Sequence, residues 1–77
     1  MSEVEVTAGG EALRKWLAVR DITQESFARR NGWSQGTVCR WIRGHLSPSI
    51  EARVSIAAVT GIKPIAWDRP ARMREVT

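Results

Sequence analysis

Apolar residues recur at helical spacing through most of this chain, with turn-forming residues between the runs. Leu13, Trp16 and Leu17, for example, fall on one face of a helix that starts near Glu11. The pattern predicts helices over residues 11–20, 24–30, 35–43 and 48–60, and a short fifth helix over 63–68. The expected fold is therefore all-α, a compact bundle of four to five helices.

Capping residues indicate where these helices begin and end. Thr23 and Ser34 are suitable N-caps for the second and third helices, and Gly32 can adopt the left-handed backbone that ends the second. Ser47 is expected to cap the fourth helix, with Pro48 in its first position.

The fourth helix is apolar on nearly all sides. Its apolar residues fall on two faces, with Ile50, Val54, Ala57 and Ala58 on one and Ala52, Ile56 and Val59 on the other. Such a helix has to be covered on both sides, and the core covers only one. Either Ile56, Val59 or the segment 65–67 makes a homodimer contact, or the C-terminal segment folds back and Trp67 fills the gap.

Residues 1–10 and 69–77 lie outside the predicted bundle, which occupies residues 11–68 as one small domain. In the N-terminal stretch, valines alternate with glutamates before two glycines, which predicts a flexible arm or, alternatively, a short edge strand. Pro70 stops the last helix, and a polar C-terminal tail follows.

The charge of the chain is positive and unevenly distributed. Twelve Lys and Arg stand against eight Asp and Glu, which gives a net charge of +4. Within residues 24–45 four arginines accompany one glutamate, and residues 63–77 are also basic. A one-sided distribution of this kind suits binding to nucleic-acid phosphates, although a basic composition alone is not specific for nucleic acid.

The stretch 23–44 predicts a helix-turn-helix, because a tight glycine turn joins two short helices and the second one ends in arginines. In that arrangement the second helix enters the major groove, and its N-terminal residues face the base edges. The residues expected to read bases are Ser34, Gln35, Gly36, Thr37 and Arg40. The alternative is a polar helix face that only contacts solvent.

Phosphate contacts are expected around the same two helices. Gln24 opens the first of them, where free backbone amides favour an anion, and Arg43 and His45 follow the second. Arg30 is also assigned to phosphate, with a purely solvated role for Arg29 and Arg30 as an equal alternative.

The pattern T-Q-x-x-x-A-x-x-x-G-x-S-x-x-x-V-x-x-W-x-x-G over residues 23–44 resembles the Cro/CI-type helix-turn-helix family of phage and bacterial repressors. The resemblance extends over about residues 12–68, and the C-terminal half is similar to the short, prophage-encoded Cro-like branch. It implies a lambda-repressor-like DNA-binding domain in which Gln24 contacts phosphate and braces Gln35. The chain departs from the usual pattern at Asn31, Trp33, Ile42, Arg53 and Thr60.

The function implied by the resemblance is that of a sequence-specific regulator of transcription, a Cro-like repressor that binds double-stranded DNA as a dimer on a palindromic operator. The alternative is an antitoxin or adaptor that mainly binds a partner protein, with DNA binding secondary. Its contact surface would be Ile42 and the second apolar face of the fourth helix.

Other classes of protein fit the sequence poorly. With one His, one Cys, no Tyr and no phosphate-cradling glycine loop, neither an enzyme nor a cofactor is expected. Cys39 and His45 alone cannot hold a structural metal. No apolar run approaches a membrane span, and the expected location is the cytoplasm of a bacterial or phage-infected cell. Trp16 and Trp41 are assigned to the core rather than to base stacking.

Overall fold

Helices account for nearly all of the regular structure in residues 5–71, the part of the chain that this computed structural model describes. The elements in order are α1 (Ala8–Arg20), α2 (Gln24–Asn31), α3 (Gln35–Arg43), α4 (Ile50–Thr60) and the 3-10 helix η1 (Pro64–Asp68). Residues 5–71 contain no strand, only an isolated bridge between Thr7 and Pro70. The prediction of a compact all-α protein is confirmed.

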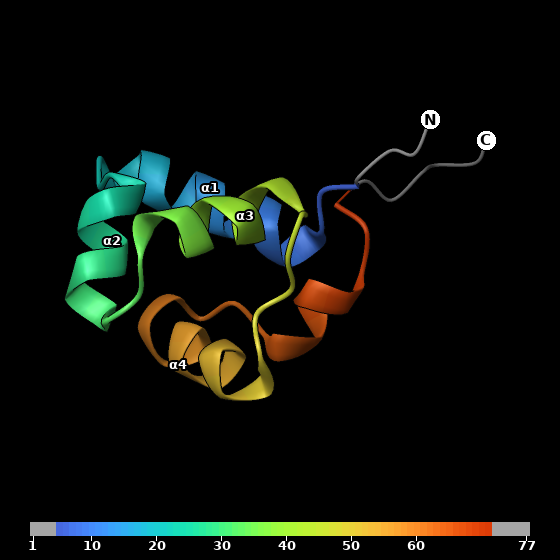
Figure 1. The fold of residues 1–77 in the computed structure, drawn as a ribbon. Helices are drawn as coiled ribbons and strands as arrows, with labels where there is room; N and C mark the ends of the chain where they lie inside the picture. The colour runs from blue at the N-terminus through green and yellow to red at the C-terminus, as the bar shows by residue number, and fades with distance from the viewer. Residues whose placement is uncertain (1–4, 72–77) are drawn as a thin grey trace.

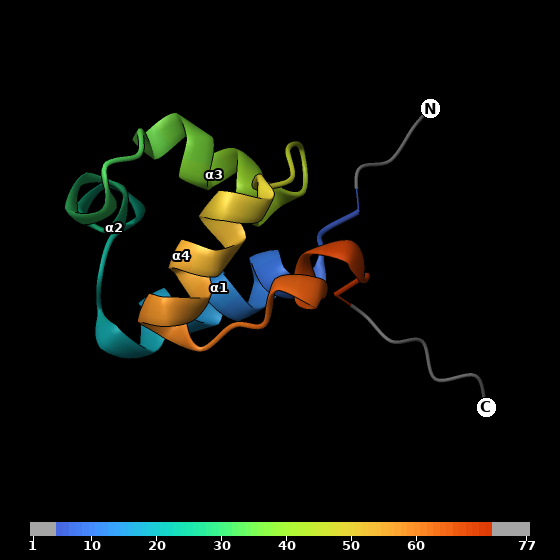
Figure 2. The ribbon, with the colours of Figure 1, turned by 90° about the horizontal axis from the view of Figure 1, so that it is seen from below.

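Two layers enclose the core. α1 and α3 lie side by side with α2 at one end, and α4 crosses beneath them (Figure 1). Seen from below, α4 passes in front of α1, and η1 lies next to the start of α1 (Figure 2). Every helix contributes apolar side chains to the core, which contains Leu13, Leu17, Phe27, Ala28, Val38, Trp41, Ile42, Ala52, Ile56, Ile62 and Trp67.

All the aromatic residues of the chain form one continuous row through this core. Trp16, Phe27, Trp33, Trp41 and Trp67 follow one another with ring centroids 6.0, 5.9, 5.0 and 6.4 Å apart. Edge-to-face contacts at such distances are favourable for aromatic rings. The assignment of Trp16 and Trp41 to the core is therefore confirmed.

Helix α1 begins at Ala8 rather than at Glu11, so the end of the predicted arm is helical. The Thr7 hydroxyl caps it by accepting a hydrogen bond from the Gly10 amide at 2.9 Å. A Cβ atom on Gly9 would collide with the Trp67 ring, and one on Gly10 would press on the carbonyls of α3. The two glycines are thus close-packing residues of a helix and not part of a loop.

Helix α4 begins at Ile50, so the predicted cap at Ser47 is wrong. Ser49 is the N-cap, and its hydroxyl accepts a hydrogen bond from the Ala52 amide at 3.1 Å. Pro48 is buried outside the helix, where its carbonyl accepts a hydrogen bond from Arg53 Nε at 3.0 Å. Both serines can cap a helix, and the sequence pattern alone did not distinguish between them.

The second face of α4, with Ala52 and Ile56, faces the core, and the C-terminal η1 packs against this helix. Ile50 and Val54 on the first face are exposed, so the expectation that both faces are covered is wrong. Ile56 is fully buried and Trp67 is 2% exposed, so neither side chain is available for the predicted homodimer contact. Arg53 fastens the segment through an ion pair with Asp68 at 3.0 Å, which lowers the pKa of that carboxyl. Of the proposed dimer residues, Val59 and Ile65 remain exposed.

The two ends of the described chain are joined. The Ala8 amide donates to the Arg69 carbonyl at 2.7 Å, and the Ala71 amide donates to the Val6 carbonyl at 2.9 Å. The first residues of the predicted C-terminal tail are therefore hydrogen-bonded to the N-terminal segment. The rest of the predicted arm and tail, residues 1–4 and 72–77, lies outside the described residues. No described helix has the length and apolar character that a membrane crossing requires.

Candidate nucleic-acid interface

The connection between α2 and α3 is a short turn with a defined hydrogen-bond pattern. Gly32 has φ +80°, a left-handed conformation that glycine adopts without strain. The Trp33 amide donates to the Ala28 carbonyl at 2.8 Å, which closes the end of α2. Thr23 and Ser34 cap the two helices as predicted, each accepting a backbone amide on its hydroxyl.

Apolar packing behind this turn sets how α3 lies against α2. The Trp33 ring is wedged between Phe27 and Trp41, at centroid distances of 5.9 and 5.0 Å. Trp33 is a departure from the repressor pattern, and its large side chain packs between α2 and α3. The outer face of α3 is consequently held in one orientation.

That outer face carries the residues predicted to read bases. Gln35, Gly36 and Arg40 are exposed, and helical spacing aligns Gly36, Arg40 and Arg43 along one side of α3. No atom of the protein lies within 4 Å of the place where a Cβ of Gly36 would stand. The fold itself therefore does not require a glycine at this position.

Ser34 and Thr37 are engaged with each other. The Ser34 hydroxyl donates to Thr37 Oγ1 at 2.9 Å and accepts from the Thr37 amide at 3.2 Å. Their hydroxyls hold the first turn of α3 together, and Thr37 is half-buried. Of the five predicted base readers, Ser34, Gln35, Gly36 and Arg40 are exposed and Thr37 is half-buried, and the Thr37 hydroxyl retains its own proton for a further hydrogen bond.

The predicted phosphate-binding residues differ in how free they are. Arg30, Arg40 and Arg43 are exposed and form no ion pair with any acid in residues 5–71. Arg29, by contrast, lies 2.8 Å from a Glu25 carboxylate oxygen. Arg30 is therefore available for a phosphate contact, whereas Arg29 is already paired with Glu25. The sequence alone does not distinguish the two residues.

Gln24 and His45 stand at opposite ends of the two-helix unit. Gln24 is half-buried at the first position of α2, and within the described residues no hydrogen bond joins its side chain to Gln35. His45 is exposed, and its amide donates to the Arg40 carbonyl at 2.9 Å as α3 ends. The implied bracing of Gln35 by Gln24 is thus not present in this structure.

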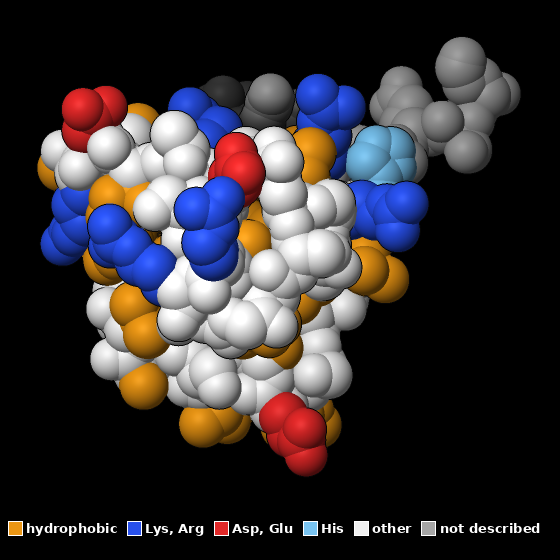
Figure 3. Space-filling model, turned by 60° about the vertical axis from the view of Figure 1, so that its left-hand side comes forward, with side chains coloured by type: hydrophobic (Ala, Val, Ile, Leu, Met, Phe, Trp, Pro, Cys, Tyr) orange, Lys and Arg blue, Asp and Glu red, His pale blue; other side chains and the backbone are white. Residues whose placement is uncertain are grey.

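The surface beside these helices is mainly basic. Figure 3 shows Lys and Arg side chains spread over the upper part of this side of the molecule, with the histidine at its edge and few acidic side chains between. No group of three or more potential metal ligands occurs in the described part of the chain. The arrangement can bind an extended anion, and its polar side chains can donate hydrogen bonds.

Sequence reasoning misplaced Ile42. The residue was offered as a contact surface for a partner protein, but its side chain is 6% exposed and belongs to the core. Ile42 follows Val38 by four positions and so falls on the buried face of α3. That spacing was the signal that would have placed it correctly.

Comparison of the chain with protein-family models, curated proteins and solved structures found no match. The function therefore has to be argued from the geometry of α2 and α3 and from the sequence pattern that they carry.

Proposed function

We propose that this protein binds double-stranded DNA sequence-specifically through α3 and represses transcription in the manner of a Cro-like repressor. The observation that carries the proposal is the outer face of α3, where Gln35, Gly36 and Arg40 are exposed next to arginines that have no acidic partner within residues 5–71. Within residues 5–71 these arginines form no ion pair that would stabilise the fold.

Each side chain suits a defined part of duplex DNA. Gln35 can form two hydrogen bonds with adenine, and Arg40 can form two with guanine, in the major groove. Gly36 allows the start of α3 to approach the DNA closely, because it presents no side chain there. Arg43, Arg30 and His45 contact the phosphate backbone, and the Gln24 backbone amide at the start of α2 donates a hydrogen bond to a phosphate oxygen.

One copy of α3 reads only a few base pairs, so the proposed regulator acts as a dimer on a two-fold symmetric operator. Its half-sites would lie roughly 34 Å apart on one side of the duplex. Since Ile56 and Trp67 are buried within the chain, the dimer contact has to involve other residues. A weak contact can form only when two copies occupy adjacent half-sites, which raise the effective concentration of the second copy.

Selection of bound duplexes from a random pool tests the proposal. The expected result is an enriched motif with two inverted half-sites, bound more tightly than unrelated DNA of equal length. Recovery of sequences without a common motif would contradict sequence-specific recognition. An enriched motif bound equally well by Gln35→Ala and Arg40→Ala variants would show that α3 is not the reading helix.

A further inference from the structure

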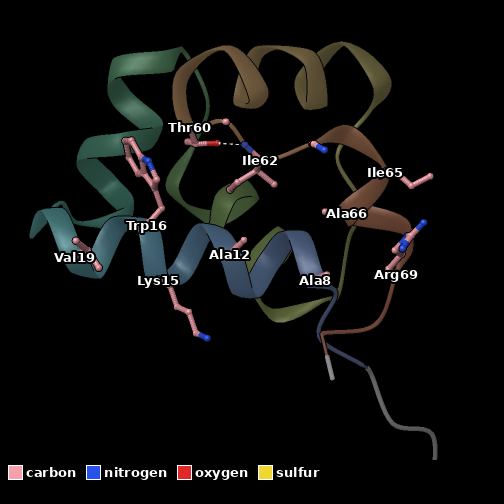
Figure 4. A pocket seen from close by; sticks show the side chains of 12 residues that line it. Ala8, Ala12, Lys15, Trp16, Val19, Thr60, Ile62, Ile65, Ala66 and Arg69 are labelled. Atoms are coloured by element: carbon pink, nitrogen blue, oxygen red, sulfur yellow. Dashed lines mark hydrogen bonds between the residues drawn. The ribbon is translucent and has the colours of Figure 1, made fainter. Parts of the chain in front are cut away.

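A groove on the side of α1 away from α3 has a composition unlike that of the DNA-facing surface. Its walls come from α1, from the connection after α4 and from η1, and none of its lining residues belongs to α2 or α3. The apolar lining residues are Ala8, Ala12, Trp16, Val19, Ile62, Ile65 and Ala66. Figure 4 shows the groove with α1 along one side and η1 at one end.

Two of the large apolar residues that line this groove are exposed to solvent. Val19 is 81% exposed and Ile65 is 53% exposed, whereas Leu13 and Leu17 on the other face of α1 are buried. Helix α1 is thus apolar on two faces, of which the fold covers one. Apolar surface gathered around a groove marks an interaction site more often than isolated exposed residues do.

Three cations accompany this apolar surface. Lys15, Lys63 and Arg69 belong to the lining, which contains no acidic residue. Lys63 and Arg69 form no ion pair with an acid in residues 5–71, and Lys15 lies 3.8 Å from a Glu11 carboxylate that binds Arg14 more closely, at 2.7 Å. A ligand that covers the groove would therefore bring its own negative charges next to these side chains.

We propose that this groove binds an acidic amphipathic helix of a partner protein. The apolar face of the helix would cover Val19, Trp16 and Ile65, and its carboxylates would pair with the cations at the rim. A partner strand is disfavoured because residues 5–71 contain no strand to which it could be added. This inference goes beyond the proposed DNA binding and does not depend on it.

The charges disfavour other occupants of the groove. A second copy of the chain, packed symmetrically through the same surface, would bring like charges together at Lys15, Lys63 and Arg69. The last residues of the chain carry Arg72 and Arg74 against Glu75, so their net charge has the same sign as the rim. Nucleic acid is also disfavoured, since a phosphate backbone would leave the apolar surface uncovered.

The test uses two designed helical peptides of about 20 residues, one with Leu on one face and Glu on the other, and one with Lys in place of Glu. We expect the acidic peptide to bind at least tenfold more tightly in fluorescence anisotropy titrations. Ile65→Asp and Val19→Asp should each weaken its binding at least tenfold, and the double variant Lys63→Glu/Arg69→Glu should abolish the preference for negative charge. Circular dichroism checks that these variants are folded.

Ile50→Asp is the matched control, because Ile50 is 76% exposed but does not line the groove. Its affinity for the acidic peptide should equal that of the parent protein. Equal binding of both peptides, or no binding of either, overturns the proposal. So does binding that is lost in Arg40→Ala but kept in Ile65→Asp, which would place the acidic peptide on α3. A dimer in sedimentation equilibrium that Ile65→Asp dissociates would identify a second copy as the occupant and likewise overturn it.

Discussion

Helices α3 and α4 are similar in length but present opposite kinds of outer surface. Helix α3 buries Val38, Trp41 and Ile42 and exposes polar and basic side chains. Helix α4 buries Ala52 and Ile56 and exposes apolar side chains, those of Ile50, Val54, Ala58 and Val59.

The difference shows which features the fold explains and which it does not. The buried face of each helix follows from packing, since both cover the same core. On the outer face of α3, Arg40 and Arg43 form no ion pair with an acid of the described chain, and no described neighbour requires a glycine at position 36. Residues that stability does not explain are the ones most informative about function, and for that reason the proposed DNA binding is assigned to the outer face of α3.

The largest expected effect comes from placing a charge on the buried face of α4. Ile56→Glu should unfold the protein, because Ile56 has 0% exposure and the new carboxylate would be buried in an apolar core. The expected loss is about 4 kcal/mol or more, comparable to the whole stability of a small domain. Thermal melting followed by circular dichroism measures it.

The control is Val54→Glu on the exposed face of the same helix, which should melt within a few degrees of the parent protein. A folded Ile56→Glu variant with altered self-association would instead support a homodimer through that face.

Gly9 and Gly36 have contrasting surroundings, so substituting them by alanine should change stability in opposite directions. Gly9→Ala should lower the free energy of unfolding by about 1–3 kcal/mol, because the added methyl group meets the Trp67 ring. Gly36→Ala should raise it by up to about 1 kcal/mol, since the space is open and alanine favours a helix. Chemical denaturation of both variants checks the signs. Equal effects would mean that Gly9 is not a close-packing residue.

The exposed face of α3 should affect DNA binding without affecting stability. Gln35→Ala and Arg40→Ala are each expected to cost about 1–3 kcal/mol on the selected operator and to relax base preference at the contacted position. Their melting temperatures should match the parent, because both side chains are exposed. Competition titrations with single-base operator variants measure the change. A uniform loss on all sequences would make them phosphate contacts.

Replacing Arg43 and replacing the paired Arg29 should change the salt dependence of DNA affinity by different amounts. Arg43→Ala should weaken binding to all DNA sequences and reduce the slope of log affinity against log salt by about one unit, the value for one lost phosphate contact. Arg29→Ala is the control, since Arg29 is already paired with Glu25. Titrations at several salt concentrations compare the two. A larger slope change for Arg29 would reverse this assignment.

The smallest effect is expected at the ion pair that joins α4 to the C-terminal segment. Hydrogen bonding to Arg53 lowers the pKa of Asp68, so the pair stabilises the fold fully above the ordinary carboxyl pKa, and this contribution is lost as pH falls through the lowered value. The difference in melting temperature between the parent and Asp68→Asn should shrink as the pH drops below about 4. A difference that is the same at pH 3 and pH 7 would show that the pair is not formed in solution.

The outer face of α3 was predictable because its determinants are local. Thr23 and Ser34 cap helices as expected, since each hydroxyl reaches an amide three residues ahead. The exposure of Gln35 and Arg40 follows from the phase of Val38 and Trp41 on the same helix. The mutual hydrogen bond of Ser34 and Thr37, and the burial of Ile42, were missed although both follow from spacing within α3.

The exposed face of α4 and the groove beside α1 were not predictable in this way. Apolar residues occur on nearly all sides of α4, so their spacing does not show which side of the helix the rest of the fold covers. The answer depends on Trp67, which lies outside the helix, and on the ion pair of Arg53 with Asp68, which are fifteen positions apart. The groove likewise requires α1 and η1 to meet, and they stand at opposite ends of the chain.

Helix type, helix number and the turn between α2 and α3 thus followed from hydrogen bonds and periodicities that act within a few residues. The covered side of α4 and the close packing at Gly9 in α1 followed only from contacts between distant segments. The Trp67 ring leaves no room for a side chain at Gly9, and Ile56 of α4 is buried in the same core as Leu13 of α1. Such contacts arise when the chain closes around a shared core, and for that reason a local pattern does not contain them.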